Sequence, residues 1–155
     1  MADFTRVNLK SDVKDMAPEH NMEGIESRFA RTNLELSNSG LSYFRLDPGY
    51  RAPFGHTHSE QEEIYVVLSG SGRVAVGDEI VDVAQWDAVR IAPGELHGME
   101  AGPDGAEILA FGAPNTQNKD AELESGWWPE GACFTYNLRL PGAPGQTSAY
   151  DRPCP

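Results

Sequence analysis

The feature that most restricts the fold of this chain is a succession of short segments bounded by glycine or proline. These segments are rich in β-branched and aromatic residues or alternate apolar with polar side chains, and they span residues 41–46, 63–69, 73–76, 79–83, 88–91 and 106–111. With 16 Gly and 11 Pro among 155 residues, little uninterrupted sequence is left for long helices. The pattern predicts an all-β protein built as an antiparallel barrel or sandwich.

The sequence also predicts one turn between strands and the number of domains. Gly70-Ser71-Gly72 predicts a tight hairpin turn between two of the strands. A chain of this length favours one domain over residues 1–155, with a barrel core at about 33–113 and a C-terminal extension over 114–155.

Both ends of the chain differ in composition from the central region. Residues 1–31 are polar and mixed, and Pro18 should end any helix that starts near Ser11. Residues 120–125 are expected to form a helical turn, and Trp127-Trp128 should pack against the barrel or a partner subunit. The tail that follows contains too much Pro and Gly for regular structure. The sequence therefore predicts short irregular or helical extensions at both ends.

The charge balance argues against several classes of partner. Twelve Lys and Arg stand against 24 Asp and Glu, so the formal net charge is -12. Such a surface repels phosphate, which argues against nucleic acid and anionic membranes as partners. The N-terminal residues contain no apolar run of the kind a secretory signal needs, and Cys133 and Cys154 form no CxxC pair. A cytoplasmic location is the expectation.

The residue types that bind transition metals gather in one part of the sequence. Three of the four histidines are His56, His58 and His97, and Glu63 lies between them. Two histidines two residues apart share one face of a strand. Imidazoles with one carboxylate suit Fe, Mn, Ni, Zn or Co. Alternatively, His56 and His58 are surface residues of a loop, and Glu62 is a rival to Glu63, although the two glutamates face opposite sides of a strand.

Two motifs that contain these residues resemble those of the cupin superfamily. The stretch His56-Thr57-His58, four residues, Glu63, six residues and Gly70 is similar to the first cupin motif, and Pro93-Gly94-Glu95-Leu96-His97 is similar to the core of the second. The resemblance covers about residues 38–113. It implies a double-stranded β-helix, or jelly-roll barrel, whose mouth holds a metal ion on His56, His58, Glu63 and His97.

The sequence departs from the cupin motifs at four positions outside the metal ligands. Tyr50 stands where the first motif often has Gly, Trp86-Asp87 replaces an opening Gly-Asp, Ile91 replaces a Pro, and Ala101 replaces an Asn. These changes predict an altered turn and a reshaped rim, so they weaken any assignment of a substrate by analogy.

Four further residues are candidates for the pocket. Tyr43 and Arg45 share one face of a strand and could point into the barrel, where Arg45 could grip a substrate; an exposed Arg at a sheet edge is the alternative. Tyr65 shares the face of Glu63, and Met99 has the parity of His97.

These observations indicate a protein that binds one divalent metal ion and a small molecule. The interpretation we favour is a metal-dependent enzyme acting on a small oxygenated compound, as an oxygenase, isomerase or lyase, with Glu63 as a possible base. A non-catalytic binding or sensing protein and a purely structural metal are the alternatives, so the sequence leaves open whether the protein is an enzyme. Exposed strand edges also predict a homodimer.

Overall fold

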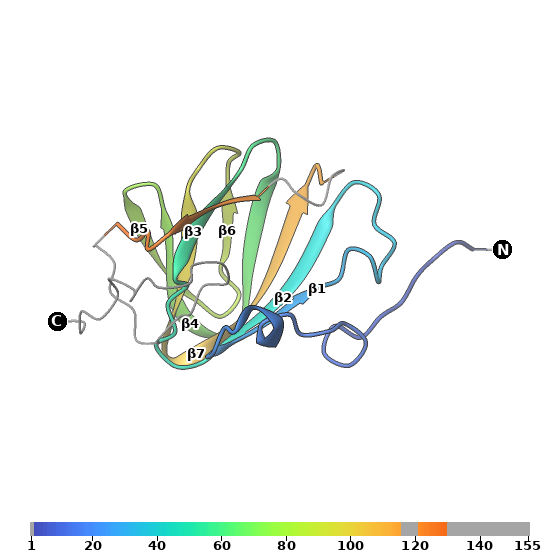
Figure 1. Cartoon of the computed structure of the whole chain (residues 1–155), viewed down its shortest axis with the longest axis horizontal. Coiled ribbons are helices and arrows are strands. Elements are labelled where there is room, and N and C mark those ends of the chain that lie inside the picture. Colours follow the sequence, from blue (N-terminus) through green and yellow to red (C-terminus); the bar gives the residue numbers. More distant parts are fainter. Residues whose placement is uncertain (1, 116–120, 130–155) are drawn as a thin grey trace, which may run out of the picture.

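The computed structural model describes residues 2–115 and 121–129. Within these residues the protein is a curled antiparallel sheet of eight strands with one 3-10 turn, η1 (Pro18–His20) (Figure 1). The strands are β1 (Ile25–Phe29), β2 (Gly40–Leu46), β3 (Phe54–His58), β4 (Glu62–Val76), β5 (Glu79–Ala84), β6 (Ala88–Ile91), β7 (His97–Ala113) and β8 (Ala121–Ser125). The predicted all-β, antiparallel fold class is confirmed.

The two longest strands form the spine of the barrel. β4 pairs with β7 from Glu62 opposite Ala113 to Val76 opposite His97. β7 also pairs with β2, and its first residue pairs with β3, while β4 also pairs with β5 and β6. The interior is filled by buried apolar side chains of these strands and the neighbouring loops, which include Leu46, Tyr50, Tyr65, Val67, Val74, Ile91, Met99 and Ile108.

The predicted hairpin at residues 70–72 is wrong, because β4 runs straight through it. The glycines are needed for close contact with β7 rather than for a turn. Gly70 has a φ of +76°, and a Cβ there would overlap the backbone of Gly105; a Cβ at Gly72 would overlap the carbonyl of Glu100. The pairing register shifts at both places, so these are irregularities within one long strand.

Besides β3, which carries the histidine pair, two strands lie outside the segments that the sequence marked as β. β1 falls in the polar N-terminal part and is held at the edge of β2. The helical turn expected at 120–125 is also wrong, because residues 121–125 form β8, which pairs along its whole length with β3. Both strands depend on non-local pairing rather than on a strong local pattern.

Trp127 and Trp128 pack on the barrel, as one of the sequence interpretations held. Gly98 of β7 lies against both indole rings, and Trp128 is 4% exposed. The guanidinium of Arg51 stacks over the Trp128 ring at 4.6 Å and donates to Glu100. The Pro-rich and Gly-rich tail and both cysteines lie outside the described residues. No helix among the described residues is long and apolar enough to cross a membrane.

Candidate metal centre

Three strands bring the four predicted ligands to one end of the barrel. His56 and His58 alternate along β3 and so face the same side, Glu63 stands near the start of β4, and His97 is the first residue of β7. His56 is the register partner of His97 in the sheet, which places residues 41 positions apart side by side. Glu63 and His97 are buried, and His56 and His58 are half-buried.

The donor atoms of these four side chains converge on one point. The Nε2 atoms of His97, His56 and His58 lie 2.9, 3.3 and 3.4 Å from Oε2 of Glu63. One ligand atom from each residue lies within 4.8 Å of all the others. Neighbouring corners of an octahedron with metal–ligand bonds of about 2.1 Å are about 3.0 Å apart, so the spacing suits a six-coordinate first-row ion.

The hydrogen bonding of His97 supports the same conclusion. Its Nδ1 lies 2.8 Å from the backbone carbonyl oxygen of Glu95, which can only accept, so Nδ1 carries the proton. In the neutral ring Nε2 then directs a lone pair at Oε2 of Glu63, only 2.9 Å away. Two acceptors at that distance repel each other unless a proton or a metal ion lies between them, so the pair is built to share a cation. Hydrogen bonding of the outer ring nitrogen to a carbonyl is also how metal-binding histidines are commonly oriented.

The protonation states of the cluster favour a cation. Burial by itself would raise the pKa of Glu63, but hydrogen bonding to His56, His58 and His97 outweighs it and holds that pKa far below its usual range. Burial lowers the pKa of His56, and the nearby Glu63 opposes this only in part. An ionised carboxylate beside a neutral imidazole is the combination that a divalent metal requires.

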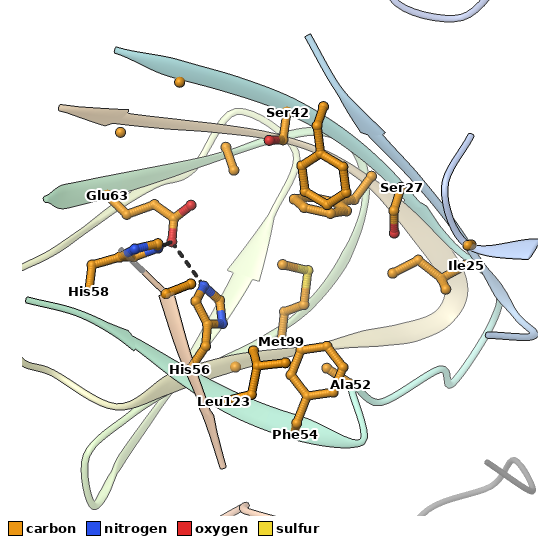
Figure 2. Close-up of a pocket in the computed structure, with 18 of the residues that line it drawn as sticks. Ile25, Ser27, Ser42, Ala52, Phe54, His56, His58, Glu63, Met99 and Leu123 are labelled. Atoms are coloured by element: carbon orange, nitrogen blue, oxygen red, sulfur yellow. Dashed lines mark hydrogen bonds and ion pairs between the residues drawn. The ribbon is translucent and has the colours of Figure 1, made fainter. Parts of the chain in front are cut away.

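The cluster forms part of the wall of a large cavity. The cavity has a volume of about 830 Å³. In Figure 2 Glu63 and His58 lie at one side of it, and Ile25 and Ser27 lie at the other. Residues of β1, β2, β3, β4, β7 and β8 line it. This volume is in the range typical of small-molecule sites.

Glu63, rather than Glu62, belongs to the cluster. The Glu62 carboxylate lies on the other face of β4, where it pairs with Arg90 at 2.6 Å and is 45% exposed. This agrees with the alternation of the strand, in which Glu63, Tyr65 and Val67 are the buried members.

Of the other candidate pocket residues, Met99 lines the cavity and three lie elsewhere. Arg45 is on the outside of β2 and pairs with Glu26 and Asp47, each at 2.6 Å. Tyr43 is on the same outer face, where Lys10 of the N-terminal segment covers its ring at 5.0 Å. Tyr65 lies buried next to the cluster, 5.8 Å from His97 between ring centroids, and burial followed by the charge of Glu63 raises its pKa.

Sequence reasoning did not find most of the cavity wall. The inner face of β2 consists of Ser42 and Phe44, which alternate with the predicted residues Tyr43 and Arg45. The sequence therefore predicted that the two pairs lie on opposite faces of the strand but not which face points into the barrel. Gln61 could have been noticed, since it has the parity of Glu63; it is 4% exposed and lines the cavity. Leu123 of β8 carried no signal, because residues 121–125 were not predicted to form a strand.

Comparison with known proteins finds a family model that matches the central part of the chain. Residues 42–111 match the family model described as the cupin domain. A search of curated proteins gave no match to the sequence.

Solved structures share the fold at low sequence identity. A cupin protein from Bacteroides fragilis is 23% identical, with a TM-score of 0.60 over 77% of this chain and 91% of that one. KdgF from Halomonas sp. is 19% identical, with a TM-score of 0.57 over 74% of this chain and 96% of that one. Oxalate decarboxylase from Bacillus subtilis is 24% identical with a TM-score of 0.64, but the 79% of this chain that aligns covers only 33% of that protein. Another structure of that decarboxylase is described by its Mn(II) centres.

Proposed function

Because this chain carries a cupin domain, we propose that it binds one divalent transition metal ion through His56, His58, Glu63 and His97. We further propose that the protein is a metal-dependent enzyme acting on a small oxygenated molecule, as an oxygenase, isomerase or lyase.

The observation that carries the proposal is the joint position of the cluster and the cavity. Three imidazole Nε2 atoms approach one carboxylate oxygen within 3.4 Å, and three of the four ligand residues also line a cavity of about 830 Å³. A purely structural metal site is usually closed by four protein ligands and surrounded by packed side chains. A site beside a cavity leaves room for a ligand next to the metal.

A bound metal of this kind would polarise a carbonyl or enediol oxygen or lower the pKa of a coordinated water. The chain contributes the rest through its own residues. Burial of Glu63 and His97 keeps the donors in place, and the hydrogen bond from His97 to the Glu95 carbonyl fixes the ring orientation. Apolar lining residues such as Phe44 and Phe54 exclude water from the space in which a substrate would lie.

Fe, Mn, Ni, Zn and Co all suit three imidazoles and a carboxylate. Mn is the first to test, since a similar barrel of oxalate decarboxylase is described with Mn(II) centres. Glu63 is the ligand best able to change denticity, and we propose it as the base if the reaction needs one.

The experiment is elemental analysis of protein purified without chelators, with His56→Ala alongside. We expect about one equivalent of metal in the wild type and a sharp loss in the variant. His20→Ala is the matched control, because His20 lines the cavity but lies outside the cluster. Unchanged metal content in His56→Ala would refute the site.

A second measurement separates a catalytic from a structural metal. In Mn(II)-loaded protein, an open coordination position should enhance water proton relaxation, and a small ligand that occupies it should remove the enhancement. Turnover of a panel of hydroxyketones, enediols and catechols, with oxygen uptake followed in parallel, then tests catalysis. Metal without exchangeable water would refute the enzyme, and ligand binding without turnover would instead indicate a binding or sensing protein.

A further inference from the structure

The cavity wall away from the metal cluster is mostly apolar. Its side chains include Ile25, Phe44, Ala52, Phe54, Met99 and Leu123, which come from five different parts of the chain. In Figure 2 Glu63 and His58 lie on one side of the cavity, and Ile25, Ala52, Phe54 and Met99 lie across from them or below. Ser27 and Ser42 add hydroxyl groups to this wall without adding charge.

Little positive charge reaches the cavity outside the cluster. Among the described lining residues, the basic side chains other than His56 and His58 of the cluster are Arg31 and His20. The Arg31 guanidinium already donates to Oδ1 of Asn115 at 2.6 Å and to the Leu36 carbonyl at 3.3 Å. No Lys lines the cavity within this part of the chain. A carboxylate placed on the apolar wall would therefore lose hydration without gaining a partner.

Two large apolar side chains of the cavity lining are exposed to solvent. Phe29 at the end of β1 is 52% exposed and Leu123 of β8 is 64% exposed. Exposed apolar area in a concave site favours the binding of an apolar surface, at about 25 cal/mol for each Å² removed from water. The cavity walls therefore favour a ligand with an apolar portion, which we call its body. The metal cluster favours a ligand with a metal-binding portion, which we call its head.

We infer that the cavity takes a ligand with an uncharged, ring-sized apolar body and a head of two adjacent oxygen donors, as in a catechol, a hydroxyketone or a hydroxamate. The head lies at the metal held by His56, His58, Glu63 and His97, and the body lies against Phe44, Phe54 and Met99. This inference rests on the proposed metal site. It excludes small dicarboxylates such as oxalate as the preferred ligand, because the cavity offers about 830 Å³ of largely apolar space for a molecule that needs little of it.

Three probes that present different bodies to the same site test the inference. Acetohydroxamate and benzohydroxamate share one chelating head and differ in the apolar body, and oxalate is a compact dianion. Titration calorimetry is done on protein loaded with one equivalent of the metal found by elemental analysis. We expect benzohydroxamate to bind roughly 10- to 100-fold more tightly than acetohydroxamate, which corresponds to about two or three additional buried CH₂-sized groups at about fourfold each, and with a more negative heat-capacity change. Oxalate should bind more weakly than benzohydroxamate.

Substitutions of residues that line the cavity test whether the apolar body of benzohydroxamate lies against its wall. Phe54→Ala should weaken benzohydroxamate binding about tenfold and leave acetohydroxamate nearly unchanged. Phe111→Ala is the matched control, because Phe111 is on β7, is 43% exposed and does not line the cavity. If Phe54→Ala does not fold, Leu123→Ser replaces it, since an exposed residue of β8 can be changed without a large effect on packing.

The outcomes separate this inference from the proposed function. Equal affinity for the two hydroxamates, or tighter binding of oxalate, in protein with one equivalent of metal would overturn the inference and leave the metal site in place. Loss of the difference in Phe111→Ala as well as in Phe54→Ala would place the apolar body elsewhere and also overturn it. Absence of metal after reconstitution would refute the proposed function, and the inference with it.

Discussion

Trp127 lies directly on Gly55, in the strand that carries two of the clustered histidines. A Cβ added at Gly55 would overlap the six-membered ring of Trp127 and lie 2.9 Å from its Cδ2 atom. Gly55 is the residue before His56, so the segment after β8 is fastened to the barrel beside the metal cluster. The contact links the C-terminal part of the described chain to the position of β3.

Gly55→Ala should therefore destabilise the protein by about 1–3 kcal/mol, because an extra methyl group in a filled contact forces a shift of the ring or the strand. Chemical denaturation measures the change. Trp127→Ala supplies the control: in that background the Gly55→Ala substitution should have a much smaller effect, since the ring is gone and only the flexible end of Leu96, 3.0 Å from the added Cβ, remains in contact. An equal loss of stability in both backgrounds would show that the contact is not what limits this position.

The two adjacent glutamates give a matched pair for the metal site. Glu63→Gln should weaken metal binding by at least about tenfold, because the amide lacks the negative charge of the only carboxylate in the cluster and offers one oxygen donor in place of two. Glu62→Gln removes the same charge one residue away, on the outer face and in an ion pair with Arg90, and should leave affinity nearly unchanged. Competition with a chromophoric chelator measures both. A large effect of Glu62→Gln alone would mean that the wrong glutamate is assigned.

The metal cluster could be predicted because the two motifs that hold its residues resemble those of cupins, whereas the pairing that brings His97 beside His56 is non-local. A two-residue spacing in a strand is enough to put His56 and His58 on one face, and alternation is enough to separate Glu63 from Glu62. The barrel was likewise visible in the segments that became β2, β5 and β6, where apolar alternation and turn residues agree.

The rest of the site depends on contacts between distant residues. Alternation divides β2 into two faces, but Tyr43 is buried outside the barrel because the N-terminal segment places Lys10 over it. Because both faces of β2 carry buried apolar side chains, the sequence pattern did not reveal which face points into the barrel. Similarly, residues 121–125 have all their side chains exposed and form a strand only because β3 is available to pair with them. Glycines at 70 and 72 indicate a turn in isolation and a close strand contact in the folded protein.

Acid should destabilise the metal-free protein through Glu63. Hydrogen bonding to the three imidazoles outweighs burial and holds the pKa of this carboxyl below its usual range in the folded state, whereas in the unfolded chain it titrates near 4.5. The unfolded state therefore binds more protons as the pH falls through that value, so the stabilising contribution is present above pH 4.5 and is lost below it.

Denaturation of chelator-treated protein at several pH values tests this expectation. Between about pH 5 and pH 3, the free energy of unfolding should fall more steeply for the wild type than for Glu63→Gln, which cannot titrate at this position. Glu62→Gln should follow the wild type, because its side chain is partly exposed and outside the cluster. Parallel curves for the wild type and Glu63→Gln would show that the cluster does not couple protonation to folding.

Trp86 offers a route to a more stable protein. It lies in the turn between β5 and β6 with a φ of +73°, a left-handed conformation that disfavours any residue with a Cβ, and its side chain is 73% exposed. Trp86→Gly should relieve about 1 kcal/mol of backbone strain while removing little buried surface, so the melting temperature should rise by a few degrees. Gln85→Gly is the control in the same turn: its residue has no positive φ, so the added flexibility, about 0.5–1 kcal/mol, and the loss of the hydrogen bond from its amide to the Leu68 carbonyl should both lower stability. A fall in stability with Trp86→Gly would mean that the indole makes contacts worth more than the strain it imposes.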